Sequence, residues 1–237
     1  MLASPSEEIR CAPPIERGAK KGCVVVGESR YIAVEGPIGV GKTSLARRLA
    51  EVFECPLVQE IADDNPFLAQ FYDEPRRWAF QTQLHFLLGR YRQQRALMAD
   101  GGSQGLVADY LFEKDRIFAE MNLKDDELAL YKEVHALFTA PLQRPDLVIY
   151  LEATPDVLLR RLRKRNRGFE RRITPQYLEG LIEAYRRFFH EYTDVPLLVV
   201  NSSAIDFVEQ GSDLADLIHE IRGMRQGVQH YIPLGSQ

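Results

Sequence analysis

The stretch from Gly36 to Thr43 reads GPIGVGKT and matches the phosphate-binding pattern G-x-x-x-x-G-K-S/T. Its surroundings have the required order, because the β-rich run YIAVEG at 31–36 leads into the glycines and a helical pattern at 42–53 follows them. Glycines let the backbone N–H groups of such a loop face phosphate oxygens, and the helix N-terminus adds positive potential. Lys42 is expected to neutralise β- and γ-phosphate oxygens, and the Thr43 hydroxyl can ligate Mg²⁺. The chain is therefore expected to form an α/β domain that binds a nucleotide through Gly36, Pro37, Ile38, Gly39, Val40, Gly41, Lys42, Thr43 and Ser44.

Short apolar runs alternate with longer helical patterns along the chain. Near-continuous apolar runs of this length are typical of parallel strands that are buried on both faces. The alternation predicts a doubly wound α/β fold with right-handed crossovers, in which a five-stranded parallel sheet is flanked by helices. The expected strands are 31–36, 56–60, 105–110, 146–153 and 196–201. The expected helices are 42–53, 75–99, 125–138, 155–165, 175–192 and 213–224.

Length and composition limit the domain organisation and the partners. The 237 residues suit one main domain, which we expect at 30–225, with a flexible extension at 1–29 and a C-terminal tail at 226–237. The net charge of -4 argues against general nucleic-acid binding, and three cysteines without C-x-x-C spacing favour a reducing compartment. No run approaches the length of a membrane span, and the first residues lack the apolar core of a secretory signal. We therefore expect a cytoplasmic protein with neither a membrane nor a nucleic acid as its partner.

A nucleotide-binding loop serves switches, motors and kinases alike. The chain has no N-K-x-D run for guanine recognition, and its size suits a small-molecule kinase. The segment RRLRKRNRGFERR at 160–172 holds eight basic residues among thirteen. It reads either as a solvated basic face or nucleic-acid patch, or as a lid over a triphosphate. The position after the fourth strand favours the lid.

An ordered set of segments then narrows the identification. They are EGPIGVGKTSLA, QE with NPFLAQFY, RRWAFQTQLHFLLGRY, DYLFEKDRIFA, DLVIYLEA and RNRGFERRITPQYL. With them, the chain from Tyr31 to Phe207 resembles the deoxynucleoside kinase family, and most closely its bacterial deoxyadenosine/deoxyguanosine kinase-like branch. The resemblance implies a P-loop kinase with an arginine-rich lid, ATP as the phosphoryl donor, Mg²⁺ as a cofactor and a homodimer.

The resemblance also implies roles around the reacting groups. Glu60 matches the glutamate that accepts the proton of the deoxyribose 5′-hydroxyl. A base at a strand end is independently reasonable, although a solvated carboxylate would look the same in sequence. Tyr72 and Glu170 match groups that contact the sugar 3′-hydroxyl. The implied lid arginines, which grip the donor phosphates, are Arg161, Arg165 and Arg167.

Recognition of the base is implied for the long helix at 75–99. Gln83 matches a glutamine that hydrogen-bonds the base, which suits an amide because it both donates and accepts. Gln81 is a nearby competitor on a different face of the helix. Arg90 lies seven residues after Gln83 on the same face and matches an arginine that helps to read the base. Phe118 matches the aromatic residue that stacks on the base.

The segment DYLFEKD departs from the family pattern. Many members carry an acid-Arg-Ser run after the third strand, and here Asp109 keeps the acid while Tyr110 replaces the arginine. Asp109 is expected to hold Mg²⁺ directly or through water. Because phosphoryl transfer needs its charge neutralised, we expect Lys114 or Arg116 to replace the arginine. Asp115 is expected to act with Arg90 in reading the base.

The sequence therefore predicts a deoxynucleoside 5′-kinase of nucleotide salvage. A purine deoxynucleoside, deoxyadenosine or deoxyguanosine, is the preferred acceptor and deoxycytidine comes next. One alternative is a nucleoside monophosphate kinase of thymidylate-kinase type, which would share the fold. Another is a nucleotide-regulated binding protein whose basic segment contacts nucleic acid.

Overall fold

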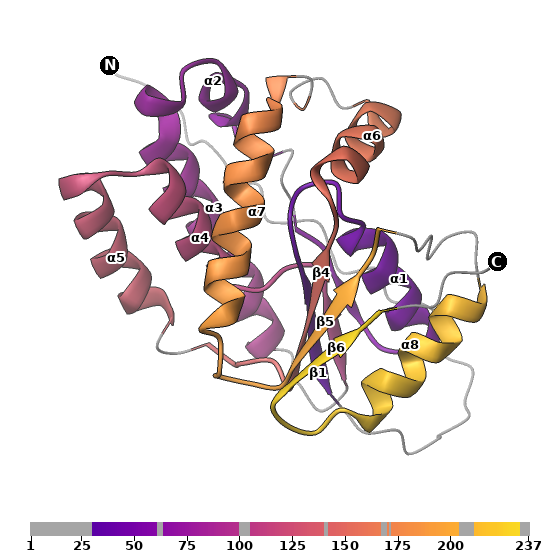
Figure 1. Cartoon of the computed structure of the whole chain (residues 1–237). Helices are drawn as coiled ribbons and strands as arrows, with labels where there is room; N and C mark the ends of the chain where they lie inside the picture. The colour runs from indigo at the N-terminus through magenta and orange to yellow at the C-terminus, as the bar shows by residue number, and fades with distance from the viewer. Residues whose placement is uncertain are drawn as a thin grey trace, which may run out of the picture.

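The computed structural model describes residues 30–60, 64–99, 105–139, 142–166, 170, 172–203 and 211–232. A parallel sheet with the strand order β2-β3-β1-β4-β5-β6 lies at its centre (Figure 1). The strands are β1 (Tyr31–Glu35), β2 (Leu57–Val58), β3 (Leu106–Ala108), β4 (Leu147–Glu152), β5 (Leu197–Asn201) and β6 (Val228–Tyr231). The doubly wound α/β architecture is thus confirmed.

The predicted number of strands is wrong by one, because the sheet has six strands rather than five. The additional strand, β6, lies within residues 226–237, for which we expected a tail. It pairs in parallel with β5, with Leu197 opposite Val228. Its residues Val-Gln-His-Tyr alternate between exposed and half-buried positions, as an edge strand with one covered face does. A strand of this kind lacks the continuous apolar run by which the other strands were identified.

Eight helices surround the sheet in the described part of the chain. Two of them, α2 and α4, are short; α2 was not expected from the sequence, and for α4 only a helix start near Lys114 and Arg116 was expected. None of the described helices combines the length and apolar character needed to cross a membrane. The helices are α1 (Lys42–Val52), α2 (Leu68–Asp73), α3 (Pro75–Ala99), α4 (Lys114–Asn122), α5 (Asp125–Thr139), α6 (Pro155–Arg165), α7 (Pro175–His190) and α8 (Gly211–Gly223).

Both faces of the sheet are covered, as the apolar strands require. Along β4, Leu147, Ile149 and Leu151 contribute to one core, which also contains residues of α1 and α8. Val148 and Tyr150 point to the opposite face and join a second core with residues of α4 and α7. Figure 1 shows the same division, with α1 and α8 on one side of the sheet and α3, α4, α5 and α7 on the other. Successive residues of β4 therefore enter opposite cores, as the two-residue period of a strand requires.

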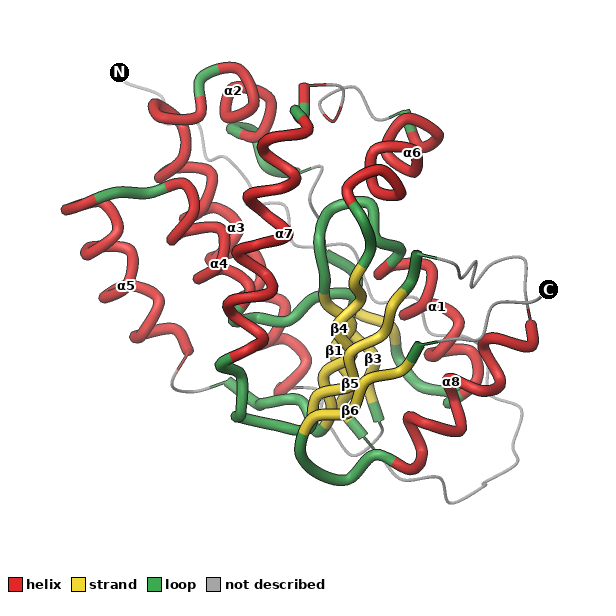
Figure 2. Tube along the Cα trace, in the orientation of Figure 1, coloured by secondary structure: helices red, strands yellow, loops and turns green. Residues whose placement is uncertain are grey.

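The helices on the second side form a further core away from the sheet. Phe71 of α2, Leu87 of α3, Leu123 after α4 and Tyr131 of α5 are buried together. This cluster holds α2 and α3 as a wall beside the carboxyl ends of β1, β2 and β3. Loops leave the strands at that edge (Figure 2), which is where ligands bind in open α/β sheets.

Candidate active site

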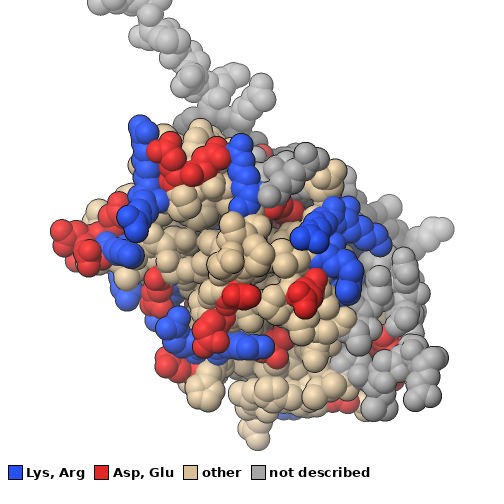
Figure 3. Space-filling view, turned by 45° about the horizontal axis from the view of Figure 1, so that its top comes forward, with Lys and Arg blue, Asp and Glu red and all other residues tan. Residues whose placement is uncertain are grey.

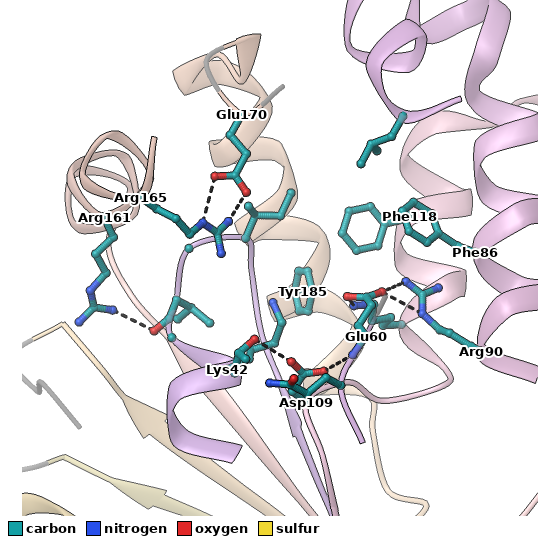
Figure 4. Close-up of a pocket in the computed structure, with 18 of the residues that line it drawn as sticks. Lys42, Glu60, Phe86, Arg90, Asp109, Phe118, Arg161, Arg165, Glu170 and Tyr185 are labelled. Carbon is teal, nitrogen blue, oxygen red and sulfur yellow. Dashed lines mark hydrogen bonds and ion pairs between the residues drawn. The ribbon is translucent and has the colours of Figure 1, made fainter. Parts of the chain in front are cut away.

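A cavity of about 540 Å³ lies at the carboxyl ends of β1, β2 and β3 (Figure 4). The phosphate-binding loop, the ends of β2 and β3, one face of α3 and residues of α6 and α7 line it. Most of the residues singled out in the sequence meet here. They are Ile38, Gly39, Val40, Gly41, Lys42, Thr43, Ser44, Glu60, Tyr72, Gln83, Arg90, Asp109, Phe118, Arg161, Arg165 and Glu170. Arg167 lies outside the described residues.

The phosphate-binding loop is held in shape by its first glycine and by Lys42. Gly36 has a φ of 152°, and a Cβ at this position would lie 2.5 Å from the carbonyl oxygen of Leu151 on β4. Lys42 Nζ folds over the loop and donates to the carbonyl oxygens of Gly36 at 2.7 Å and Pro37 at 3.2 Å. Desolvation lowers the pKa of Lys42, although the charge of Glu35 opposes this effect. The ammonium group is thus poised at the loop, where an anionic ligand would favour its charged form.

Asp109 connects the loop with the end of β2. Its Oδ2 accepts a hydrogen bond from the Thr43 hydroxyl at 2.6 Å, and its Oδ1 accepts one from the backbone N–H of Glu60 at 2.6 Å. Burial raises the pKa of Asp109, and the hydrogen bond from Thr43 partly opposes that rise. A cation at this carboxylate would favour the ionised form.

Asp109 and Thr43 fit the requirements of Mg²⁺. This ion commonly binds through one or two protein oxygens, with phosphate oxygens and waters completing its shell. A carboxylate and a hydroxyl side by side at the mouth of a phosphate loop are such a pair. No group of three or more His, Cys, Asp or Glu side chains arranged to hold a metal occurs in the described residues. Phosphate oxygens of a nucleotide, together with waters, would therefore supply the other ligands.

Glu60 lies between two cations. Arg90 donates to Glu60 Oε1 through Nε at 3.0 Å and through a second N–H, and Lys114 Nζ donates to Oε2 at 2.6 Å. Burial alone would raise the pKa of Glu60, but the charges of Arg90 and Lys114 outweigh it and hold that pKa well below its usual range. Glu60 is therefore a carboxylate at neutral pH, and it faces the cavity.

The residue after Asp109 turns away from the site. Tyr110 is fully buried in the core, and its ring centroid lies 5.9 Å from the guanidinium carbon of Arg90. Lys114, at the start of α4, is only 3% exposed, and its ammonium group contacts the carboxylate of Glu60. Arg116 is exposed and pairs with Glu120 at 3.9 Å on the outer face of α4. Of the two cations considered in the sequence, only Lys114 thus lies at the cavity.

Aromatic side chains and one buried amide line the side of the cavity next to α3. Gln83 lines the cavity and is 3% exposed, whereas Gln81 points to solvent. Tyr72 and Phe118 also line this side. Rings and one amide in a concave site are suited to a flat heterocycle with hydrogen-bonding edges. Asp115 is fully buried beneath the lining, where it pairs with Arg90 and can act on a ligand only through that arginine.

The arginines of α6 lie on the side of the cavity that the phosphate-binding loop lines (Figure 4). Arg161 donates to the carbonyl oxygen of Val40 at 2.9 Å and to that of Ser202 at 2.7 Å. Arg165 donates to Glu170 through Nε at 3.0 Å and through a second N–H. Glu170 is 6% exposed and thus sits at the inner end of this pair.

Four aromatic lining residues, Phe71, Phe86, Tyr177 and Tyr185, and one buried acid were missed in the sequence. Phe86 lies three residues after Gln83 on α3, so helical periodicity could have indicated it. Tyr177 and Tyr185 are eight residues apart on α7 and both line the cavity. Glu35, the last residue of β1, lies directly beneath the site and read in sequence only as the end of a strand.

The surface charge does not form one continuous basic area on the face shown in Figure 3. Lys and Arg side chains stand in separate groups with Asp and Glu between them. An extended patch of one sign is what non-specific nucleic-acid binding requires. This face of the molecule therefore gives no support to the nucleic-acid alternative.

Comparisons with known proteins match most of the chain. The family model described as "Deoxynucleoside kinase" matches residues 32–225. A deoxyguanosine kinase of Bacillus subtilis is 37% identical over 198 residues, which cover 81% of this chain and 96% of that protein. A deoxyadenosine kinase of Dictyostelium discoideum is 33% identical over 205 residues, which cover 84% of this chain and 82% of that protein.

Solved structures agree with the fold. The structure of a deoxyadenosine kinase from M. mycoides with dCMP and dCDP has a TM-score of 0.69 and 24% identity, and the match covers 81% of this chain and 98% of that one. The same enzyme with bound dATP has a TM-score of 0.69 and 22% identity, with 82% of this chain and 99% of that one covered. At this level of identity the match bears on the architecture alone.

Proposed function

The chain belongs to the deoxynucleoside kinase family and is a phosphotransferase, and we propose that it transfers the γ-phosphoryl group of ATP or another nucleoside triphosphate to the 5′-hydroxyl of a deoxynucleoside. One observation carries the proposal. A single cavity joins a phosphate-binding loop on one side to an aromatic and amide-lined recess on the other, with Glu60 and Asp109 between them. Two substrates, one with a triphosphate and one with a base, would meet at these carboxylates.

Glu60 is the group that orients the acceptor. Its carboxylate would accept the hydrogen bond of the 5′-hydroxyl after giving up one of its present contacts with Arg90 or Lys114. The O5′–Pγ bond then forms, the bond from Pγ to the β,γ-bridging oxygen breaks, and the proton passes to Glu60 while the nucleoside diphosphate leaves. Because its pKa is held low, Glu60 is a weak base, and the proton moves once the new P–O bond has made the hydroxyl acidic.

The charge that develops on the transferred group needs several cations. Lys42 and the lid arginines Arg161 and Arg165 would bind the donor phosphates. Lys114 would supply positive charge at the acceptor side, in place of the arginine that the family pattern puts at 110. Thr43 and Asp109 would hold Mg²⁺, which supplies charge neutralisation on the phosphates.

The acceptor is expected to be a purine deoxynucleoside. Gln83 would bond the edge of the base, Arg90 would assist it from the same face of α3, and Phe118 would stack on the ring. Tyr72 and Glu170 would contact the sugar. The names of the relatives, a deoxyguanosine kinase and a deoxyadenosine kinase, support a purine. Deoxycytidine is the next candidate.

A steady-state panel tests this proposal. The purified chain is assayed with ATP and Mg²⁺ against deoxyadenosine, deoxyguanosine, deoxycytidine and thymidine, and against the four corresponding monophosphates. We expect turnover of a purine deoxynucleoside to exceed that of the others. Faster turnover of thymidine would contradict the assignment of the base site, and preference for a monophosphate would favour the thymidylate-kinase-type alternative. Sedimentation of the same sample tests the expected homodimer.

A further inference from the structure

Glu35 is a buried acid at the end of strand β1, a position where the packing of the sheet does not require a charged side chain. It is the last residue of β1, whose four preceding residues are all buried and include the aliphatic Ile32, Ala33 and Val34, and it is itself 0% exposed. A buried carboxylate is costly unless hydrogen bonds and a nearby cation compensate for its desolvation. An apolar residue at this position would continue the strand core without that cost. The acid therefore calls for an explanation in terms of the groups that it holds.

Both oxygens of Glu35 are engaged, and each faces a different part of the site. Oε1 accepts hydrogen bonds from the backbone N–H of Gly36 at 2.8 Å and from the hydroxyl of Tyr185 at 2.9 Å. Oε2 accepts one from the backbone N–H of Leu111 at 2.8 Å and lies 4.0 Å from Lys114 Nζ. One carboxylate thus contacts the first residue of the phosphate-binding loop, the turn after β3, a wall of the cavity and a buried cation.

The contact with Leu111 bears directly on where Lys114 lies. The N–H of Lys114 donates to the carbonyl oxygen of Leu111 at 3.2 Å, so that Leu111 begins the turn from which α4 starts. Glu35 fixes the N–H of this same Leu111. The ammonium group of Lys114 then lies between two carboxylates, at 4.0 Å from Glu35 and 2.6 Å from Glu60.

We propose that Glu35 is a positioning residue for phosphoryl transfer, acting through Lys114 to hold this cation between the donor loop and Glu60. The inference rests on the proposed function, because Lys114 matters to the rate only if a phosphoryl group passes it. The Lys114 ammonium group contacts Glu60 at 2.6 Å, and Glu35, at 4.0 Å, is the second carboxylate that attracts it. With the charge of Glu35 removed, no second carboxylate draws the ammonium group away from Glu60 when the acceptor hydroxyl binds. The cation then blocks the group that should accept the hydroxyl proton.

A double-mutant cycle on kcat tests this coupling. Glu35→Gln keeps the size of the side chain and removes its charge, and Lys114→Met keeps the length of that chain and removes its charge. We expect Glu35→Gln alone to lower kcat by roughly tenfold to a hundredfold, as the loss of charge-assisted hydrogen bonds does. The KM values for ATP and for the deoxynucleoside should change by less than about threefold. In the Lys114→Met background the same change should lower kcat by less than about threefold.

Each outcome of the cycle decides the inference. Fold losses that multiply in the double variant overturn it, and so does a Glu35→Gln effect that appears only in the KM for ATP, because the residue would then serve the loop alone. Failure of the proposed function is recognised separately, since the unchanged chain would phosphorylate no deoxynucleoside. Thermal unfolding of every variant establishes that the compared proteins are folded.

Tyr185→Phe provides a second cycle should Glu35→Gln not fold. It removes the hydroxyl that holds Oε1 and leaves the carboxylate charge of Glu35 in place. We expect a loss of kcat of about threefold to tenfold in the unchanged chain and none in the Lys114→Met background. Tyr192→Phe is the matched control, because the Tyr192 hydroxyl is also buried but has no hydrogen-bond partner among the described residues. Equal losses of kcat in both backgrounds would overturn the inference here too.

Discussion

Replacing Lys114 by methionine would remove the one cation that approaches Glu60 from α4. The ammonium group lies 2.6 Å from the Glu60 carboxylate, so a phosphoryl oxygen near the bound hydroxyl would sit within a few ångströms of it. Two unit charges about 4 Å apart at an effective dielectric constant of about 20 interact by about 4 kcal/mol, equivalent to roughly a thousandfold in rate. Loss of a single preorganised donor typically costs ~10²–10³ in kcat. We therefore expect Lys114→Met to lower kcat by about a hundredfold to a thousandfold.

The assay is steady-state phosphorylation of a purine deoxynucleoside by ATP and Mg²⁺, with the fold checked by circular dichroism. Glu60 keeps its pairing with Arg90 in this variant, so its charge remains compensated and the chain should fold. Lys114→Arg, which keeps the charge, should recover part of the rate. Arg116→Ala is the control and should stay within about twofold of the unchanged chain, because Arg116 is exposed. A folded Lys114→Met protein that keeps more than about a tenth of kcat would refute the reasoning.

Three further changes have defined outcomes. In Gly36→Ala the added Cβ would meet the carbonyl oxygen of Leu151 at 2.5 Å, so MgATP should no longer raise the Tm measured by thermal shift. Gln83→Leu should lower kcat/KM for purine deoxynucleosides by about tenfold to a hundredfold in the kinase assay, whereas Gln81→Leu, at an exposed position, should leave it unchanged. Burial, together with a neighbouring arginine charge, lowers the pKa of His135 from 6.5 to about 4. The unfolded chain therefore takes up its proton first, and the free energy of unfolding should fall between pH 6.5 and about 4 by about 2 kcal/mol, allowing for partial screening by solvent. Urea titrations at several pH values should show a smaller fall for His135→Leu, and an equal fall would contradict the assignment.

The parts of the fold that follow from local pattern could be predicted from the sequence. The loop at 36–43 and the strand before it are coded by glycines and a continuous apolar run, which act over a few residues. Strand β6 could not be found in this way, because an edge strand with one exposed face carries a weak apolar signal. Its place in the sheet depends on pairing with β5, some thirty residues earlier in the chain.

The site residues also differ in whether local sequence pattern or tertiary packing determines their position. The choice of Gln83 over Gln81 was possible because the spacing of Gln83 from Trp78 and Tyr72 matches the family pattern, and Gln83 does line the cavity. The choice between Lys114 and Arg116 was not, because it depends on where α4 begins and how it packs on α7 and the sheet. Glu35 was missed because an acid at the end of a strand usually lies in solvent. Its burial depends on Leu111 and Tyr185, which are distant in sequence and contact it only in the folded chain.

The strand order β2-β3-β1 has a consequence for the spacing of the two halves of the site. Asp109 follows β3, so it stands between Glu60 at the end of β2 and the phosphate loop at the end of β1. Adjacent strands lie about 4.8 Å apart, which separates the outer two by about 10 Å. The distance between acceptor and donor is therefore set by the spacing between strands of the sheet and not by the conformation of the loops. Changes in the length of the helical crossovers that preserve the pairing of these three strands should leave that distance unaltered.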